Sequence, residues 1–165
     1  PIVGLEPSCL FTLKDELPSL LRDRAGKVPE MAMLFEEFIA REAAAGRLDG
    51  LKLKPIGTKA LVHGHCHQKA FAAMGPVQTA LKLIPGLDVS VIESSCCGMA
   101  GAFGYEKDHI EVSMKMAELS LLPAVRAADP DTILVADGTS CRHQIHDGAG
   151  REAIHVSRVL ERALA

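Results

Sequence analysis

Five cysteines are the residues of this sequence whose type and spacing most directly suggest chemistry. They are Cys9, Cys66, Cys96, Cys97 and Cys141. An odd number cannot all pair within one chain, and a disulfide between two adjacent cysteines would be strained. Because nothing else in the sequence indicates an oxidising compartment, we expect free thiols or metal ligands at these positions.

The residues around two of these cysteines favour the thiolate, the form of cysteine that binds metals. Cys66 lies in the segment HGHCHQK at 63–69, and Arg142 and His143 follow Cys141. Positive neighbours lower the pKa of a thiol, and so do the N-termini of helices that begin after such loops. These surroundings therefore suit a negatively charged sulfur cluster.

Other residues near the cysteines are expected to bind a cofactor without being its main ligands. His63, His65 and His67 suit positions that orient or neutralise the ligating thiolates. Gly98 and the two glycines that follow it would let the backbone approach a bulky group and donate N–H bonds to sulfide. The predicted cofactor-binding residues outside the cysteines are therefore His65, His67 and Gly98.

The number and softness of the sulfur ligands narrow the choice of metal. Thiolate-rich sites select zinc or iron–sulfur clusters, and an available histidine favours zinc. Five cysteines exceed the four ligands that zinc takes, so we expect an iron–sulfur cluster, with zinc on a subset of the cysteines and a histidine as the alternative. The sequence has no Cys-x-x-Cys, which is the spacing typical of zinc ribbons and ferredoxins.

Two other classes of function would use the same residues. In a thiol enzyme, one cysteine in HGHCH would act as a nucleophile beside a histidine base, but four cysteines would then have no role. A zinc-stabilised interaction module would use the same ligands and would show neither colour nor redox activity. These two classes stay open as alternatives to an electron-transfer domain.

Short apolar runs alternate with stretches of helical period, the pattern of an α/β domain with a parallel sheet and helices on both faces. The sequence predicts strands at 2–5, 59–63, 88–93, 132–136 and 153–156. It predicts helices at 29–47, 76–84, 107–128 and 157–164, the third with a kink at Pro123.

Each group of cysteines follows the end of one predicted strand. The carboxyl ends of parallel strands lie at one edge of a sheet, where loops from distant parts of the chain converge on ligands. The sequence therefore predicts cysteine loops at the C-terminal edge of the sheet, with all five sulfurs in one place.

Length, charge and hydropathy exclude several classes of function. The 165 residues fit one compact domain, and the net charge of -3 gives no basic footprint for nucleic acid. No apolar run reaches the roughly 18 residues needed to span a bilayer. The chain also lacks a glycine-rich dinucleotide fingerprint, so we do not expect it to bind FAD or NAD by itself. We expect the protein to be cytoplasmic, either free or peripherally bound at the inner face of the membrane.

Four segments, GLEPSC, HGHCHQKA, ESSCCGMAGAFGYE and DGTSCRHQI, are spread along the chain from near its beginning to near its end. The order of Cys66, then Cys96-Cys97-Gly98, then Cys141 resembles the cysteine-rich CCG domain. That family includes the heterodisulfide reductase B subunit, the glycolate oxidase iron–sulfur subunit and the anaerobic glycerol-3-phosphate dehydrogenase C subunit. The segments are most similar to the C-terminal iron–sulfur region of FAD-linked D-2-hydroxy acid dehydrogenases.

The resemblance implies a 4Fe-4S cluster on Cys66, Cys96, Cys97 and Cys141, with Cys9 available as a fifth thiolate. The family pattern often ends in Cys-x-x-Cys, whereas Gln144 stands here in place of the final cysteine. An unusual cluster, an ordinary cubane and a zinc ion therefore all remain open.

The resemblance also implies a place in a larger enzyme. Residues 1–50 would be the tail of a first CCG unit and 51–165 a second unit, so that a chain beginning at Pro1 is expected to be a C-terminal piece. FAD, bound elsewhere, would take a hydride from D-lactate or D-2-hydroxyglutarate. Clusters here and in a ferredoxin-like domain would pass single electrons to a membrane quinone or another acceptor. The chain alone is expected not to be catalytic.

Overall fold

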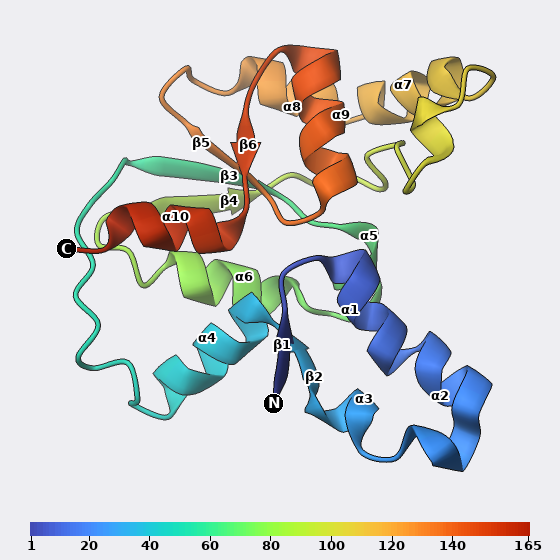
Figure 1. Ribbon diagram of the computed structural model, residues 1–165. Coiled ribbons are helices and arrows are strands. Elements are labelled where there is room, and N and C mark those ends of the chain that lie inside the picture. Colours follow the sequence, from blue (N-terminus) through green and yellow to red (C-terminus); the bar gives the residue numbers. More distant parts are fainter.

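The computed structural model describes residues 1–165 as two parallel β-sheets surrounded by helices (Figure 1). The larger sheet has the strand order β4-β3-β5-β6, and the smaller one pairs β1 with β2. The strands are β1 (Ile2–Gly4), β2 (Ala32–Leu34), β3 (Lys59–His63), β4 (Asp88–Val91), β5 (Ile133–Ala136) and β6 (Ala153–Ile154). All strand pairs are parallel, so the predicted α/β class is confirmed.

The helices vary in length from a single turn to three turns. They are α1 (Pro7–Lys14), α2 (Glu16–Leu21), α3 (Val28–Met31), α4 (Phe35–Ala44), α5 (Cys66–Ala70), α6 (Met74–Leu81), α7 (Ile110–Glu118), α8 (Leu121–Ala127), α9 (Thr139–Ala149) and α10 (Val156–Ala163). Two short 3-10 turns, Arg22–Ala25 and Phe103–Tyr105, complete the chain. None of the helices combines the length and apolar character required to cross a membrane.

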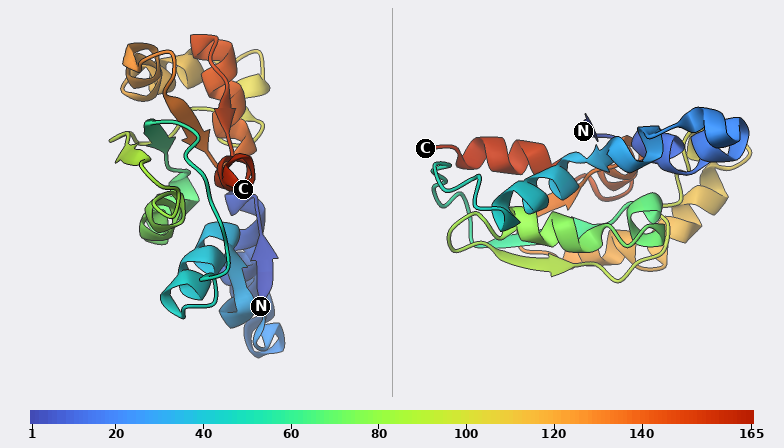
Figure 2. Two further views of the ribbon diagram at one scale, coloured as in Figure 1. Left: turned by 90° about the vertical axis from the view of Figure 1, so that its left-hand side faces the viewer. Right: turned by 90° about the horizontal axis from the view of Figure 1, so that it is seen from below.

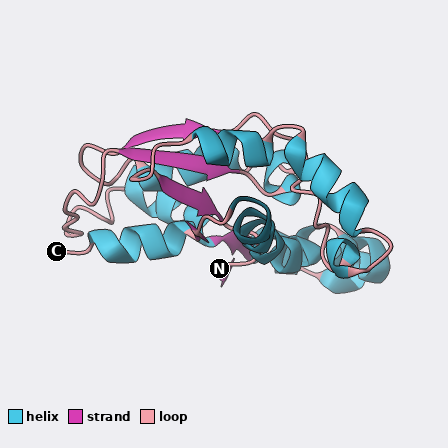
Figure 3. Ribbon diagram, turned by 90° about the horizontal axis from the view of Figure 1, so that it is seen from above, coloured by secondary structure: helices cyan, strands magenta, loops and turns pink.

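Helices cover both faces of the larger sheet because its two central strands are apolar on both sides. On one face, Ala60 and Val62 of β3 join a core with α6 and α10. On the other face, Leu134 and Ala136 of β5 pack with α8 and α9, and Leu61 lies against them. This alternation follows from the two-residue period of a strand. Figure 3 shows the strands lying between these helices.

The N-terminal segment, 1–50, packs beside the larger sheet with a small core of its own (Figure 2). Phe11 is buried in this core and stacks on Phe71, with 4.6 Å between ring centroids. Glu6 accepts hydrogen bonds from the backbone N–H and the hydroxyl of Thr139, at 2.9 and 2.8 Å. His155 bonds the carbonyl of Leu5 at 2.8 Å. These contacts fix the segment next to the start of α9.

The first predicted strand does not join the main sheet. Residues Ile2–Gly4 pair with Ala32–Leu34, so the predicted helix at 29–47 is interrupted by a strand between α3 and α4. Ala32 and Leu34 alternate with an intermediate residue and are fully buried, a strand pattern that the helical spacing of the neighbouring apolar residues concealed. The helix α4 begins only at Phe35.

The predicted helix at 107–128 is two helices rather than one kinked helix. The break falls at Leu119 and Ser120, between α7 and α8. Pro123 lies in the first turn of α8, where a proline needs no hydrogen-bond partner and does not distort the helix. The helices α1, α2, α5 and α9 were not predicted.

Candidate metal centre

Four of the five cysteines lie beyond the carboxyl ends of three adjacent strands, β4, β3 and β5. The strand β3 ends at His63, and Cys66 opens the helix α5 three residues later. Cys96 and Cys97 lie in the loop after β4, and Cys141 lies in the first turn of α9 after β5. The prediction that strand ends would gather these cysteines at one edge of the sheet therefore agrees with the geometry.

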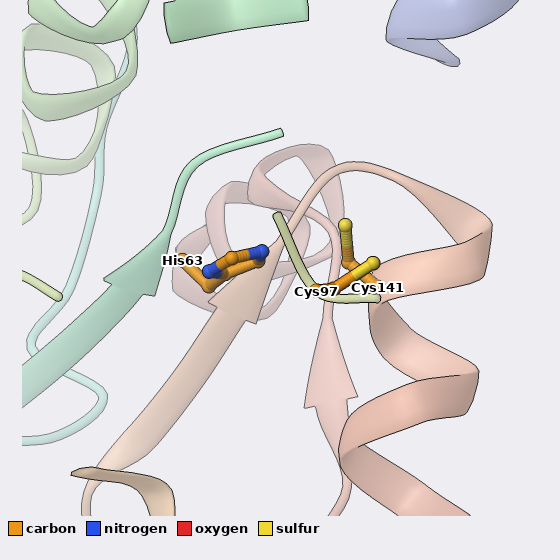
Figure 4. Close-up of side chains that lie close together, drawn as sticks. All are labelled: His63, Cys97 and Cys141. Atoms are coloured by element: carbon orange, nitrogen blue, oxygen red, sulfur yellow. The ribbon is translucent and has the colours of Figure 1, made fainter. Parts of the chain in front are cut away.

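The four sulfurs form an outer pair and an inner pair. The Sγ atoms of Cys66 and Cys96 are 3.9 Å apart, and both residues are accessible to solvent. Cys97 and Cys141 are buried, and their ligand atoms and a ring nitrogen of His63 all lie within 4.8 Å of one another. Figure 4 shows a ring nitrogen of His63 directed toward these two sulfurs. Soft sulfur donors with one nitrogen fit iron–sulfur clusters and zinc.

The thiols strongly perturb each other's protonation. The hydrogen bond from the Cys141 thiol lowers the pKa of Cys97 to about 4. The same hydrogen bond and burial raise the pKa of Cys141, because its proton is held by the neighbouring thiolate. Burial and the nearby Cys96 raise the pKa of Cys66 to about 11. Four close thiols therefore cannot all ionise unless positive charge lies between them, and bound metal supplies that charge.

His63 occupies the buried end of β3. Its Nδ1 lies 2.9 Å from the Ser94 hydroxyl, whereas its buried Nε2 has no hydrogen-bond partner. Burial lowers the pKa of His63, so the ring stays neutral at neutral pH. A neutral imidazole with one free nitrogen beside thiols is chemically suited to a metal.

Lys69 fixes the loop that precedes the adjacent cysteines. Its ammonium group donates to the carbonyls of Ser94 and Ser95, the latter at 2.7 Å. Burial lowers the pKa of Lys69, while the nearby thiols, which favour its charged form, oppose this shift. The positive charge lies where a negatively charged sulfur cluster would need it.

Gly98 contacts the site through its backbone. Its N–H donates to the Cys96 sulfur at 3.3 Å, a type of bond that the sequence predicted for cluster sulfur. Its φ of +91° and the carbonyl of Ser113, 2.1 Å from where a Cβ would lie, admit only glycine. Gln144, which stands where the family pattern has its final cysteine, donates to the same carbonyl at 3.1 Å.

The other two histidines shape the helix that carries Cys66. His65 caps α5 by accepting the N–H of His67 at its Nδ1, and the two rings stack 5.2 Å apart. Because β3 ends at His63, the three histidines do not follow the strand alternation that would place them on one side. That His65 and His67 bind a cofactor remains a prediction.

Cys9 makes none of the contacts that link the other four cysteines. It is exposed in the first turn of α1 and borders an apolar depression of about 360 Å³ beside β1. It belongs to neither of the two groups of side chains whose ligand atoms cluster closely enough to share an ion. Cys9 follows β1, which belongs to the smaller sheet, whereas the other four cysteines follow strands of the larger sheet.

A second buried polar group lies near the site and was not apparent in the sequence. Glu36, Asp137 and His155 have ligand atoms within 4.8 Å of one another, and all three are buried. The amide nitrogen of Gln68 donates to Glu36 at 2.6 Å and to Asp137 at 2.7 Å. This group ties α4 to α5 and to the loop after β5.

Fold and site together define a sulfur-rich α/β domain able to hold metal, and its relatives are parts of dehydrogenases. The chain is 28% identical over 165 residues to the C subunit of anaerobic glycerol-3-phosphate dehydrogenase of Escherichia coli strain K12, covering 100% of this chain and 41% of that protein. It is 28% identical over 162 residues to D-2-hydroxyglutarate dehydrogenase of the same strain, covering 97% of this chain and 15% of that enzyme.

The D-2-hydroxyglutarate dehydrogenase of Haemophilus influenzae is also 28% identical over an alignment of 155 residues, which covers 88% of this chain and 14% of that enzyme. The chain is therefore homologous to the C-terminal part of these proteins and spans less than half of their length. No protein-family model matches the chain, and no solved structure matches it significantly.

Proposed function

We propose that the chain is an iron–sulfur electron-transfer domain of an FAD-linked D-2-hydroxy acid dehydrogenase, with a 4Fe-4S cluster on Cys66, Cys96, Cys97 and Cys141. The observation that carries the proposal is the meeting of four thiols from three separate segments at the carboxyl edge of the larger sheet. The similarity to dehydrogenase parts supports the redox role.

The donor set fits this group. Four thiols match the ligand number of a four-iron cluster, and the Gly98 N–H already donates to one of the sulfurs. Lys69 supplies positive charge next to the sulfurs, and Cys97 and Cys141 lie out of reach of water. When bound, the cluster would accept and release single electrons. The surrounding residues would hold its sulfurs, limit water and balance its charge.

Zinc is the alternative occupant. His63, Cys97 and Cys141 form a compact buried group of one nitrogen and two sulfurs, and either outer cysteine would complete a tetrahedral site. A zinc-bound domain would support the structure of the same enzyme without carrying electrons.

The N-terminal segment is proposed to be the end of a first CCG unit. The order β1, α1, β2, α4 resembles the order β5, α9, β6, α10, except that α2, a 3-10 turn and α3 lie between α1 and β2; in both cases the two strands pair in parallel. Cys9 is the third residue of α1 and Cys141 the third residue of α9. This correspondence supports Cys9 as a ligand of a first centre, completed by residues outside 1–165, with 51–165 as the second unit.

The partners and route of the electrons follow from the same proposal. FAD-binding and ferredoxin-like domains of the full protein would deliver electrons from the D-2-hydroxy acid. A quinone at the inner face of the membrane, or another acceptor, would receive them. The domain would relay electrons in the cytoplasm and would perform no chemistry on the substrate.

Anaerobic reconstitution with iron and sulfide tests the proposal. The wild-type chain is expected to turn brown, with absorption in the visible range, and Cys97→Ser is expected to lose bound iron and sulfide. Cys9→Ser is the matched control and should keep both. Full iron and sulfide in Cys97→Ser, or a colourless wild type with stoichiometric zinc, would contradict the proposal.

A further inference from the structure

His63 holds an unusual position among the buried polar side chains of the chain. It is 2% exposed, it ends the central strand β3, and its Nε2 has no hydrogen-bond partner. A buried polar atom without a partner costs about 1 to 3 kcal/mol, so its persistence calls for an explanation. The sulfurs of Cys97 and Cys141 lie within 4.8 Å of a ring nitrogen of His63 (Figure 4).

The hydrogen bonds around Ser94 accommodate the tautomer of His63 that a metal ligand requires. The Ser94 hydroxyl lies 3.5 Å from the carbonyl of Ile92, to which it donates, and it accepts from Lys69 at 3.3 Å. With the hydroxyl proton directed at Ile92, the 2.9 Å contact with His63 would be a bond from Nδ1–H to the hydroxyl oxygen. In this tautomer, Nε2 carries a lone pair and no proton.

This arrangement is the one that metal-binding histidines adopt. Such a histidine donates its other ring N–H to a neighbouring acceptor, which fixes the ring and directs the free nitrogen at the metal. The contrast with His65 and His155 is informative, because each of these uses its Nδ1 to accept a backbone N–H at the start of a helix. Of these three, only His63 forms a group with Cys97 and Cys141 whose ligand atoms lie close enough to share an ion.

A metal ion beside Cys97 and Cys141 would give Nε2 the partner that it lacks.

We infer that His63 is a direct ligand of the metal centre through Nε2, beside Cys97 and Cys141; it would be a fifth protein donor to an iron–sulfur cluster and the nitrogen donor of a zinc site. The inference rests on the proposed metal centre and applies whether iron or zinc occupies it. It replaces the expectation that His63 lies outside the ligand shell.

Pulsed electron paramagnetic resonance on the reconstituted, dithionite-reduced chain tests the inference. With histidine labelled by ¹⁵N, we expect a strong nitrogen coupling that changes from ¹⁴N to ¹⁵N character. The variant His63→Gln should lose this nitrogen coupling while keeping a side-chain donor for Ser94. The matched control His67→Gln should keep the coupling. The labelled wild type decides whether any histidine is bound even if His63→Gln fails to hold the cluster.

The outcomes separate this inference from the proposed function. A cluster that forms without histidine coupling, or with coupling that persists in His63→Gln, overturns the inference alone. If only zinc binds, X-ray absorption should show one nitrogen and three sulfurs around the zinc in the wild type. This result would support His63 as a ligand and would contradict the proposed iron–sulfur cluster. Zinc with four sulfurs would overturn both, as would a chain that binds neither metal.

Discussion

Replacing Glu36 with glutamine is expected to remove a pH dependence from the stability of the fold. The Glu36 side chain is fully buried, accepts one bond from Gln68, and has a second oxygen without a partner. Burial, followed by the negative charge of Asp137, raises the pKa of Glu36 to about 8. Glu37 on the same helix adds to this rise, and His155 lies 3.5 Å from the Asp137 carboxylate.

The direction of the effect follows from proton binding. The Glu36 carboxyl has a pKa near 4.5 when unfolded and about 8 when folded, so between these values the folded state holds the extra proton. Stability from this group therefore falls as pH rises, by about 1.4 kcal/mol per pH unit. The loss between about pH 5 and pH 7 amounts to about 3 kcal/mol, and it stops above the folded pKa. Glutamine cannot ionise, so Glu36→Gln has no such loss.

Urea unfolding of wild type and variant at several pH values measures this difference directly. The difference in free energy of unfolding, Glu36→Gln minus wild type, should increase by about 1.4 kcal/mol per pH unit between about pH 5 and pH 7. Glu111→Gln is the matched control, because the Glu111 side chain is 80% exposed on α7. A difference between Glu36→Gln and wild type that stays constant with pH would refute the reasoning.

Three further changes test other parts of the structure. Gly98→Ala should lower stability by about 2 to 3 kcal/mol, because of its positive φ and the Ser113 carbonyl, and an unchanged melting temperature would argue against that contact. Phe11→Ala should cost about 3 to 5 kcal/mol in urea unfolding and release the N-terminal segment to proteolysis; protection like that of the wild type would contradict the docking described. Lys69→Met should make the reduction potential of a reconstituted cluster more negative, since the charge that favours the reduced form is gone, and a redox titration identical to the wild type would count against this role.

The main sheet was predictable because its strands are short apolar runs with clear ends. The observed β3 has the predicted bounds, and β5 differs by one residue. The strand β2 was not predictable from local pattern, because Ala32 and Leu34 become a strand only by pairing with residues thirty positions earlier. The helix α9 was missed because its sequence is mostly polar and its few apolar residues give only a weak helical pattern.

The site was predictable to the extent that strand ends determine it. Cys66, Cys97 and Cys141 follow strands that are neighbours in the sheet, and topology then brings them together. The orientation of His63 depends on Ser94, 31 positions away, and no local pattern reveals such a bond. The Glu36 carboxylate likewise acquires its environment from Gln68, 32 positions away.

The metal content and low-temperature electron paramagnetic resonance spectrum of the reconstituted, dithionite-reduced wild-type chain test the central claim most directly. The account predicts about four irons and four sulfides per chain, with the signal of a reduced four-iron cluster. A colourless protein that carries one zinc ion and gives no signal would contradict it.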